Sequence, residues 1–586
     1  MSQTAQSRLA GFFRNEQIVL AMLAVITGVA AGLGGVAFRY AISGVQYLVY
    51  GSGTNRLNTF VESLPWWQIL LAPAVGGLVV ALMARYLTSD RRFHGVPDVI
   101  EASALHGGRM KLRDGCVAAL GSFTSLGFGA SAGREGPVVH IGAVLASTVA
   151  QWFKLRRSLT MTLLGCGVAA GIAASFNAPI AGVFFALEVV IGHYGLTAFA
   201  PVVLASVMGT IVTRIAFGDF PAFAVESHVI VSLWETPAFA LLGIVAAGVA
   251  YLFMFGIFFV QDTLSSLKIP MILRPIGGGL LVGAIAVFYP QVLGVGYDAT
   301  DTALQGGMTI ALMLTLVVLK TVATSATLGS GFGGGVFSPS IYIGAMLGGA
   351  FGLIASLTLP DYASHHSVYA IVGMGAVAGA VLGAPISTIL IVFELTANFD
   401  LTIAVMIATA LASLITNHVI GKSFFRWHLE RRNVDVAGGQ VRALMHDTRV
   451  SKIVDKEPPS LAPDADKPAI LAALAISPKG DFVVAGADQT LLGVVTLEDL
   501  RPLLFGETDT DETAGQLARE PRVLLMPQDD LALALDRMDK CDDDFIPVVD
   551  NDTDMRLEGI VRKRDLVREH NRALVDASTE SRGGTI

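Results

Sequence analysis

Two short stretches, Gly133-Arg-Glu-Gly-Pro137 and Gly335-Val-Phe-Ser-Pro339, decide how this chain folds. Each one interrupts a long apolar region with glycines and a proline. In lipid, such a break leaves backbone N–H and C=O groups unpaired unless they line something polar. Interrupted apolar segments at matching places in two halves of a chain point to a binding site near the middle of the membrane. The pattern therefore predicts two related halves with a polar site between them.

An internal repeat supports this prediction. The positions that recur at an offset of 202 residues are Leu126, Gly127, Gly129, Gly133 and Pro137, which return as Leu328, Gly329, Gly331, Gly335 and Pro339. Further along, Ala178-Pro-Ile180 and Glu188 return as Ala384-Pro-Ile386 and Glu394 at an offset of 206. Chance glycine matches are easy in a chain with 63 glycines, but ordered agreement that includes prolines and glutamates favours a true duplication.

Charge is distributed unevenly along the 586 residues. Residues 441–586 carry 18 Lys and Arg against 29 Asp and Glu, whereas the first 440 residues carry only 22 against 19. The first part has too few charges to solvate a soluble domain, so we predict a membrane protein followed by a soluble domain. The uncharged run of 21 residues from Ile18 to Phe38 reaches the roughly 20 residues needed to span hydrocarbon. The lipid bilayer is thus the first predicted partner.

Several classes of function are excluded by composition. An apolar content of 53 % excludes disorder, and an acidic chain with few basic clusters is a poor candidate for nucleic-acid binding. The cysteines Cys116, Cys166 and Cys541 are isolated, so neither a disulfide scaffold nor a metal site is expected. No nucleophile or metal set such as HExxH is present, so we do not expect an enzyme.

The two glycine-rich stretches predict an anion site. Pro137 is expected as the first residue of a helix that continues over residues 138–150. A helix that starts there directs unpaired N–H groups and about half a positive charge at whatever precedes it. Glu135 would be costly at membrane depth without a role. It either occupies the anion site when ionised and leaves when protonated, or it is the structural partner of Arg134; the symmetry of the halves favours the first.

The last part of the chain contains a repeat of its own. Residues 491–500 and 557–566 match at an offset of 66, and each reads as a short strand that leads into a helix. Residues 545–549 are an earlier strand of the second copy. We therefore predict a duplicated α/β module.

Together, the GREGP run, the GxFxP run and the segment Asn177-Ala-Pro179 that leads to Glu188 make this chain resemble the CLC family of chloride channels and chloride/proton antiporters, with a C-terminal pair of CBS domains. The resemblance covers nearly the whole length. It implies an all-α multi-pass membrane protein, built as an inverted repeat of tilted and broken helices, with a cytoplasmic α/β CBS pair. It also implies a homodimer with one pore per subunit in the inner (plasma) membrane.

This resemblance sets the expected domain limits. They are a cytoplasmic N-terminal segment at 1–16, a membrane domain at 17–432 with repeats at 17–225 and 226–432, tandem CBS domains at 433–570 with copies at 440–505 and 510–570, and a C-terminal tail at 571–586.

The resemblance also implies roles for single residues. Glu135 matches the gating glutamate, Val336 and Phe337 match backbone donors of the central anion site, and Arg134 and Gly136 flank the gate. Residues 93–97 match the loop in which a serine hydroxyl usually faces the anion, which would make His94 and Gly95 anion-binding. His94 could donate to the anion and make its binding pH-dependent, or it could be turned aside within its loop. Phe425 stands where a tyrosine usually caps the anion; it cannot donate and would close the inner gate by bulk.

Val189 decides between two mechanisms. Many antiporters of the family have a proton-carrying glutamate at this place, so valine favours a voltage- or pH-gated chloride channel; the alternative is a chloride/proton antiporter. A CBS-containing cation transporter is more distant, because Glu135, Glu188 and Glu394 are the main membrane carboxylates. We interpret Glu188 and Glu394 as anchors of helices. Chloride is the expected transported ion, and no cofactor is required.

An adenine nucleotide is the one further ligand that the resemblance suggests. Thr496-Leu-Glu-Asp499 fits the pattern with which CBS domains bind ribose, because a carboxylate can accept from both ribose hydroxyls. The second copy has Arg562 in place of the threonine. With only one matching half, a structural tail is favoured over a nucleotide sensor.

Overall fold

The structure is a computed structural model that divides into two compact units, Met1–Val436 and Ala437–Ile586. The residues it describes are 16–53, 60–192, 194–219, 230–396, 398–434, 436, 441, 445–446, 448–477, 480–505, 512–541, 543–551 and 554–581. The expected N-terminal segment, apart from Glu16, and the expected boundary between the repeats at residues 225 and 226 lie outside the described residues.

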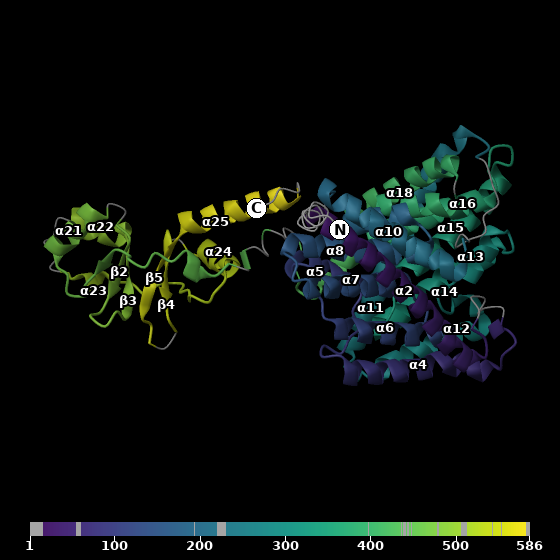
Figure 1. Ribbon diagram of the computed structural model, residues 1–586, viewed down its shortest axis with the longest axis horizontal. Helices are drawn as coiled ribbons and strands as arrows, with labels where there is room; N and C mark the ends of the chain where they lie inside the picture. Colours follow the sequence, from purple (N-terminus) through teal and green to yellow (C-terminus); the bar gives the residue numbers. More distant parts are fainter. Residues whose placement is uncertain are drawn as a thin grey trace, which may run out of the picture. The chain divides into compact units, whose positions relative to one another are not determined.

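The described part of the membrane unit consists of helices joined by loops (Figure 1). The helices of its first half have counterparts in the same order in the second half, which ends with the additional helix α19 (Phe424–Glu430). The first half comprises α2 (Glu16–Tyr50), α4 (Trp66–Leu87), α5 (Val96–Leu105), α6 (Leu112–Gly127), α7 (Glu135–Trp152), α8 (Arg157–Phe176), α9 (Pro179–Phe185), the π-helical turn η1 (Ala186–Ile191) and α10 (Leu196–Phe217). The second comprises α11 (Thr236–Ser266), α12 (Leu273–Phe288), α13 (Tyr297–Leu304), α14 (Ile310–Ser330), α15 (Phe337–Thr358), α16 (His366–Leu382), α17 (Pro385–Thr396), α18 (Phe399–Ile420) and α19 (Phe424–Glu430).

Eight stretches of helix in the described residues are long and apolar enough to cross a membrane. Helices from the two halves also pack against each other, α4 on α12 and α9 on α17. The predicted all-α membrane fold of broken helices is therefore confirmed.

The breaks fall at equivalent places in the two halves. α8 ends at Asn177 and α16 ends at Gly383, both in the left-handed backbone region with φ of 58° and 65°. Glycine and asparagine adopt this conformation more readily than other residues, and it terminates a helix. A short helix, α9 or α17, then starts with a proline in both halves.

Close helix packing also repeats. α7 packs on α8 and α15 on α16, and a Cβ at Gly142 would overlap the carbonyl oxygen of Gly167. A Cβ at Gly344 would overlap that of Gly373 in the same way. Glycine at these points brings two helix backbones into direct contact.

One local prediction was wrong. α7 begins at Glu135, so Pro137 is the third helical residue rather than the first, and the helix extends to Trp152. Proline is tolerated there because the first four N–H groups of a helix have no partner within the helix.

The C-terminal unit contains two small sheets. Strands β1 (Ser460–Leu461), β2 (Phe482–Ala485) and β3 (Leu491–Val495) form one sheet, and β4 (Phe545–Val549) pairs antiparallel with β5 (Leu557–Arg562). The helices are α21 (Lys467–Ile476), α22 (Leu497–Phe505), α23 (Ala514–Leu517), α24 (Leu531–Asp539) and α25 (Lys563–Ser581).

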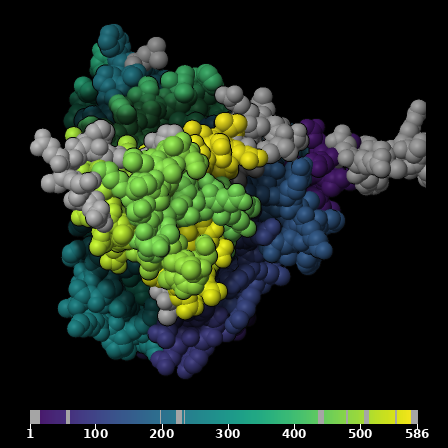
Figure 2. All heavy atoms as spheres, turned by 90° about the vertical axis from the view of Figure 1, so that its left-hand side faces the viewer, coloured from purple at the N-terminus to yellow at the C-terminus, as the bar shows by residue number. Residues whose placement is uncertain are grey.

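The predicted strand–helix repeat is confirmed, because β3 leads into α22 and β5 leads into α25. Residues of both sheets, including Val483 and Ile560, share one apolar cluster. The green first copy and the yellow second copy accordingly adjoin on the face of this unit seen in Figure 2. α25 continues without a break past residue 571, where a separate tail was expected to begin.

Candidate functional site

The two glycine-rich stretches meet backbone to backbone. Gly133 N–H donates to the carbonyl oxygen of Gly335 at 2.7 Å, and Gly335 N–H donates to that of Gly133 at 2.8 Å. The two loops thus form one antiparallel bridge. Two residues beyond it, α7 begins at Glu135 and α15 begins at Phe337. Unpaired N–H groups and the positive ends of both helix dipoles therefore surround one point, which favours an anion.

Glu135 supplies the negative charge at this point, and its side chain is fully buried. The Tyr297 hydroxyl donates to Oε1 at 2.6 Å, and the Ser338 hydroxyl donates to Oε2. Arg134 Nε lies 3.7 Å from Oε1. The carboxylate is therefore held by donors from α13 and α15 and is more than an ion-pair partner of Arg134.

Two further carboxylates cap helices across the repeat. Glu188 of the first half accepts from the N–H groups at the start of α17, including Ser387 N at 2.8 Å. Glu394 of the second half accepts from the N–H groups at the start of α9, including Ala181 N at 2.7 Å. Each carboxylate satisfies backbone donors that a helix start leaves unpaired. This geometry agrees with their interpretation as helix anchors.

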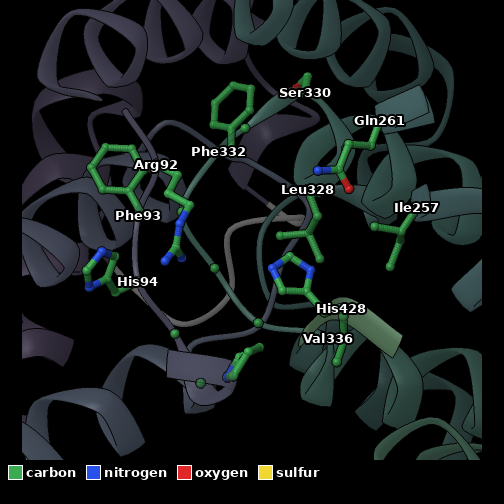
Figure 3. A pocket seen from close by; sticks show the side chains of 18 of the residues that line it. Arg92, Phe93, His94, Ile257, Gln261, Leu328, Ser330, Phe332, Val336 and His428 are labelled. Atoms are coloured by element: carbon green, nitrogen blue, oxygen red, sulfur yellow. The ribbon is translucent and has the colours of Figure 1, made fainter. Parts of the chain in front are cut away.

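A cavity of about 590 Å³ adjoins the Gly133–Gly335 bridge and takes its walls from both halves (Figure 3). Its lining includes six of the predicted anion-binding positions: His94, Gly95, Gly136, Val336, Phe337 and Phe425. Arg134 and Glu135 do not line the cavity. Because α7 starts at Glu135 and its next residue, Gly136, is part of the wall, Glu135 adjoins the cavity.

Basic side chains outnumber acidic ones in the cavity wall, and Asp90, Glu101 and Asp262 outside the wall pair with Arg92, Arg432 and Arg431. Its described charged residues are Asp98 and the arginines Arg85, Arg91, Arg92, Arg274, Arg431 and Arg432. Asp98 is already paired with Arg92 at 2.7 Å and Arg432 at 3.1 Å. Arg92 is directed into the cavity in Figure 3. A cavity lined by one sign of charge raises the local concentration of counter-ions, here anions.

In the loop before α5, the hydrogen-bonding groups of His94 and Gly95 already have partners nearby in the sequence. His94 Nε2 lies 3.1 Å from Asp90 Oδ2, and its ring meets the His140 ring edge to face at 6.0 Å. Gly95 N–H donates to Asp98 Oδ2 at 2.8 Å, because Asp98 caps the start of α5. Of the two alternatives for His94, the structure shows the side chain bonded within its loop. An anion at this loop has to displace Asp98 from Gly95.

Part of the cavity wall is aromatic. Phe425 of α19 is only 5 % exposed and packs edge to face on Phe424 at 6.0 Å. The Phe337 ring lies 4.9 Å from that of Phe176 in α8. These rings offer no hydrogen-bond donor, so donors to an anion here come from the backbone.

The position at which many antiporters of the family have a proton-carrying glutamate is apolar in this chain. Val189 lies half-buried in η1 against the apolar core. His140, one turn after Gly136 in α7, is buried, and neither ring nitrogen has a hydrogen-bond partner among the described residues. Glu135 and His140 are the two ionisable side chains of α7.

Sequence reasoning missed the two hydroxyls on Glu135. Ser338 lies inside the GxFxP run, so a hydroxyl beside the predicted backbone donors was an available signal. Tyr297 is 162 residues away from Glu135, and no local pattern connects them. The arginines of the cavity were missed as well, although the pairs Arg91-Arg92 and Arg431-Arg432 flank predicted site segments.

Comparison with known proteins shows the family to which this architecture belongs. The family model described as voltage gated chloride channel matches residues 76–417. A putative chloride channel protein, ClcB-like, from Ralstonia nicotianae is 34 % identical over 412 residues, which is 68 % of this chain and 94 % of that protein. The chain belongs to the CLC family. The voltage-gated ClC-type chloride channel ClcB of Escherichia coli is 29 % identical over 415 residues, 70 % of this chain and 99 % of that protein.

Solved structures share the CLC fold. A slow cyanobacterial Cl⁻/H⁺ antiporter superposes with a TM-score of 0.64 at 24 % identity and covers 71 % of this chain and 98 % of its own. A eukaryotic CLC transporter has a TM-score of 0.60 at 20 % identity and covers 93 % and 97 %. At these identities the likeness shows the fold alone. Membership of the CLC family makes the chain a membrane-spanning chloride transport protein.

The C-terminal unit of this CLC chain contains a CBS domain, whose family model matches residues 514–571. The predicted ribose-binding pair lies in the first copy, where Asp499 Oδ2 accepts from Thr496 N at 2.8 Å and Thr496 Oγ1 at 2.7 Å. Arg519 Nε adds a third contact at 3.3 Å and also pairs with Asp543. Burial opposes the charge on Arg519, but Asp543 and Asp499 outweigh it and raise the pKa of this guanidinium. A ribose would compete with these bonds.

Asp499→Ala is expected to loosen the C-terminal unit. The change removes the acceptor of the Thr496 N–H at the start of α22 and one partner of Arg519, at a cost of about 1–2 kcal/mol. Limited proteolysis of the full-length protein should cleave this unit roughly 5- to 30-fold faster. The control is Glu498→Ala, an exposed neighbour for which the structure gives no side-chain bond. Equal cleavage rates for the two variants would contradict a structural role of Asp499.

Proposed function

We propose that this CLC chain is a chloride channel in which Glu135 is the gate, opened by protonation or by membrane voltage. The observation that carries the proposal is the Gly133–Gly335 bridge, with α7 and α15 starting beside it and a buried carboxylate at the same point. An ionised carboxylate and a chloride ion cannot share one spot of positive potential. Glu135 therefore blocks the path when ionised and frees it when protonated or displaced.

The cavity supplies the rest of the path. Its arginines attract chloride from solution, and the backbone at Gly136, Val336 and Phe337 holds the ion at the helix starts. Phe425 narrows the passage by bulk rather than by a hydrogen bond. The tight aromatic lining makes dehydration of the ion part of its selection, so preference among anions is expected to follow their hydration.

The second candidate is a chloride/proton antiporter on the same scaffold. Val189 carries no proton, which favours passive conduction. An antiporter would need another proton carrier, and His140 of α7 is the candidate; its buried imidazole has no hydrogen-bond partner among the described residues, and such burial disfavours the charged form, so this candidate is the weaker one.

Flux from liposomes separates the two candidates. Purified full-length protein is reconstituted with a chloride gradient, the membrane potential is set with potassium and valinomycin, and chloride and pH are recorded together. A channel releases chloride without uphill proton movement. Uphill proton movement driven by chloride would establish the antiporter, and an absence of chloride flux would contradict both candidates. Parallel runs with nitrate, bromide and fluoride give the anion preference.

Family membership supports an inference about assembly and location. We infer a homodimer with one pore per subunit, in the inner (plasma) membrane, with the C-terminal unit in the cytoplasm as a CBS pair. In that pair an adenine nucleotide has one candidate ribose-binding pair of residues, Thr496 and Asp499. Mass photometry of the detergent-solubilised protein at twice the monomer mass would support the dimer, and monomer mass would contradict it.

A further inference from the structure

We propose that Tyr297 and Ser338 form a hydroxyl clamp that holds ionised Glu135 in the anion path and thereby sets the pH at which the path opens. The inference rests on the proposed role of Glu135 as the gate. Backbone N–H groups at two helix starts are enough to attract an anion. The two hydroxyls are additional donors, and in this structure both donate to the Glu135 carboxylate.

The clamp grips both oxygens of the carboxylate from different elements. Tyr297 is the first residue of α13 and donates to Oε1 at 2.6 Å, whereas Ser338 is the second residue of α15 and donates to Oε2. Hydrogen bonds to a charged acceptor are stronger than neutral ones, and burial strengthens them further. Glu135 has to break both bonds before it can leave the path.

Tyr297 is itself fixed in place. The Arg134 guanidinium lies 4.7 Å over its ring. The turn that leads to Tyr297 is held by Lys320, whose Nζ donates to the carbonyl oxygens of Val292 and Gly294, both at 2.9 Å. Lys320 is fully buried, and no carboxylate pairs with it among the described residues. Its bonds therefore serve this turn, and the hydroxyl of Tyr297 reaches Glu135 from a rigid support.

The charges around the clamp are positive. Arg134 directly precedes α7, and Arg39 of α2 lies within electrostatic range of both Arg134 and Tyr297. Lys320 of α14 supports the turn before α13. These cations remain when a clamp hydroxyl is removed, so the effect of such a variant isolates the hydrogen bond from the surrounding field.

The direction of the effect follows from the donors. A hydroxyl that donates to a carboxylate stabilises its ionised form relative to the protonated form. The ionised form of Glu135 is the closed gate. Without the Tyr297 hydroxyl, protonation and opening occur at higher pH, and chloride displaces the carboxylate more easily.

The test is Tyr297→Phe against the matched control Tyr342→Phe. Tyr342 is also buried, in α15, and its hydroxyl has no hydrogen-bond partner among the described residues. Chloride flux is measured against pH in liposomes, and chloride affinity is measured by calorimetry on the purified protein at neutral pH. For Tyr297→Phe we expect a midpoint about one pH unit higher and a chloride Kd about tenfold lower, equivalent to about 1.4 kcal/mol. Ser338→Ala should shift both readouts in the same direction.

The outcomes separate the clamp from the gate. If Tyr297→Phe and Ser338→Ala match Tyr342→Phe in both readouts while Glu135→Gln loses its pH dependence, the clamp is overturned and the gate stands. A midpoint that moves to lower pH in Tyr297→Phe also overturns the clamp. If Glu135→Gln keeps the pH dependence of the unmodified protein, the gate fails and the clamp fails with it. Calorimetry decides the matter even for a protein that passes little chloride.

Discussion

Glu135→Gln is expected to give chloride flux that no longer depends on pH. Glutamine has nearly the shape of glutamate but cannot ionise, so it does not compete with chloride for the positive point beside the Gly133–Gly335 bridge. In the unmodified protein, the open fraction should change roughly tenfold for each pH unit above the midpoint, as for a single titrating group. In the variant, flux should stay at the level that the unmodified protein reaches in acid.

Two further variants make this result decisive. Glu62→Gln removes an exposed carboxylate in the turn before α4 and should behave like the unmodified protein. Glu135→Ala removes the side chain altogether and should also conduct at every pH. If the alanine variant conducts freely but the glutamine variant stays closed, the hydroxyl clamp is holding a neutral amide. Unchanged pH dependence in both variants would remove Glu135 from the gate.

Gly344→Ala is expected to destabilise the membrane unit. The added Cβ would overlap the carbonyl oxygen of Gly373, where α15 and α16 are in backbone contact. Overpacking of this kind typically costs about 1–3 kcal/mol. The melting temperature of the detergent-solubilised protein, followed by fluorescence-detected size exclusion, should fall by several degrees.

The matched control is Gly277→Ala in α12. Both positions are glycines inside long helices, so alanine brings the same gain in helix propensity, up to about 1 kcal/mol. A Cβ at Gly277 has no heavy atom within 4 Å among the neighbours that count as tertiary contacts. This variant should therefore melt at or above the temperature of the unmodified protein. Equal melting temperatures of the two variants would show that α15 and α16 can move apart at Gly344 without loss of stability.

The sequence was enough to predict the two halves and their meeting point. Glycine and proline at fixed spacing are local signals, because they determine where a membrane helix can stop and start. The same reasoning located Glu135 and identified Glu188 and Glu394 as anchors. The exact start of α7 was missed, because proline fits any position of the first turn and does not mark one of them.

Contacts between segments that are distant in the sequence could not be predicted. Nothing near Tyr297 signals that its hydroxyl meets Glu135, and nothing near Lys320 signals that it holds the turn before α13. The loop at His94 shows a second limit. A family pattern assigns donors to an anion, but it does not reveal that Asp98 of the same loop already accepts from Gly95. Such competition depends on side-chain geometry, which spacing does not encode.

The exchange of carboxylates between the halves bears on how such a chain arose and is synthesised. α9 is capped by Glu394, which leaves the ribosome more than two hundred residues later, so the first half emerges with an uncompleted helix end. An ancestral protein of half this length would have completed its helix starts by pairing with an identical copy. The glutamate of each copy would then have accepted from the N–H groups of the other. Fusion of the two genes would then have made that partnership permanent, and neither half would since have been free to be lost.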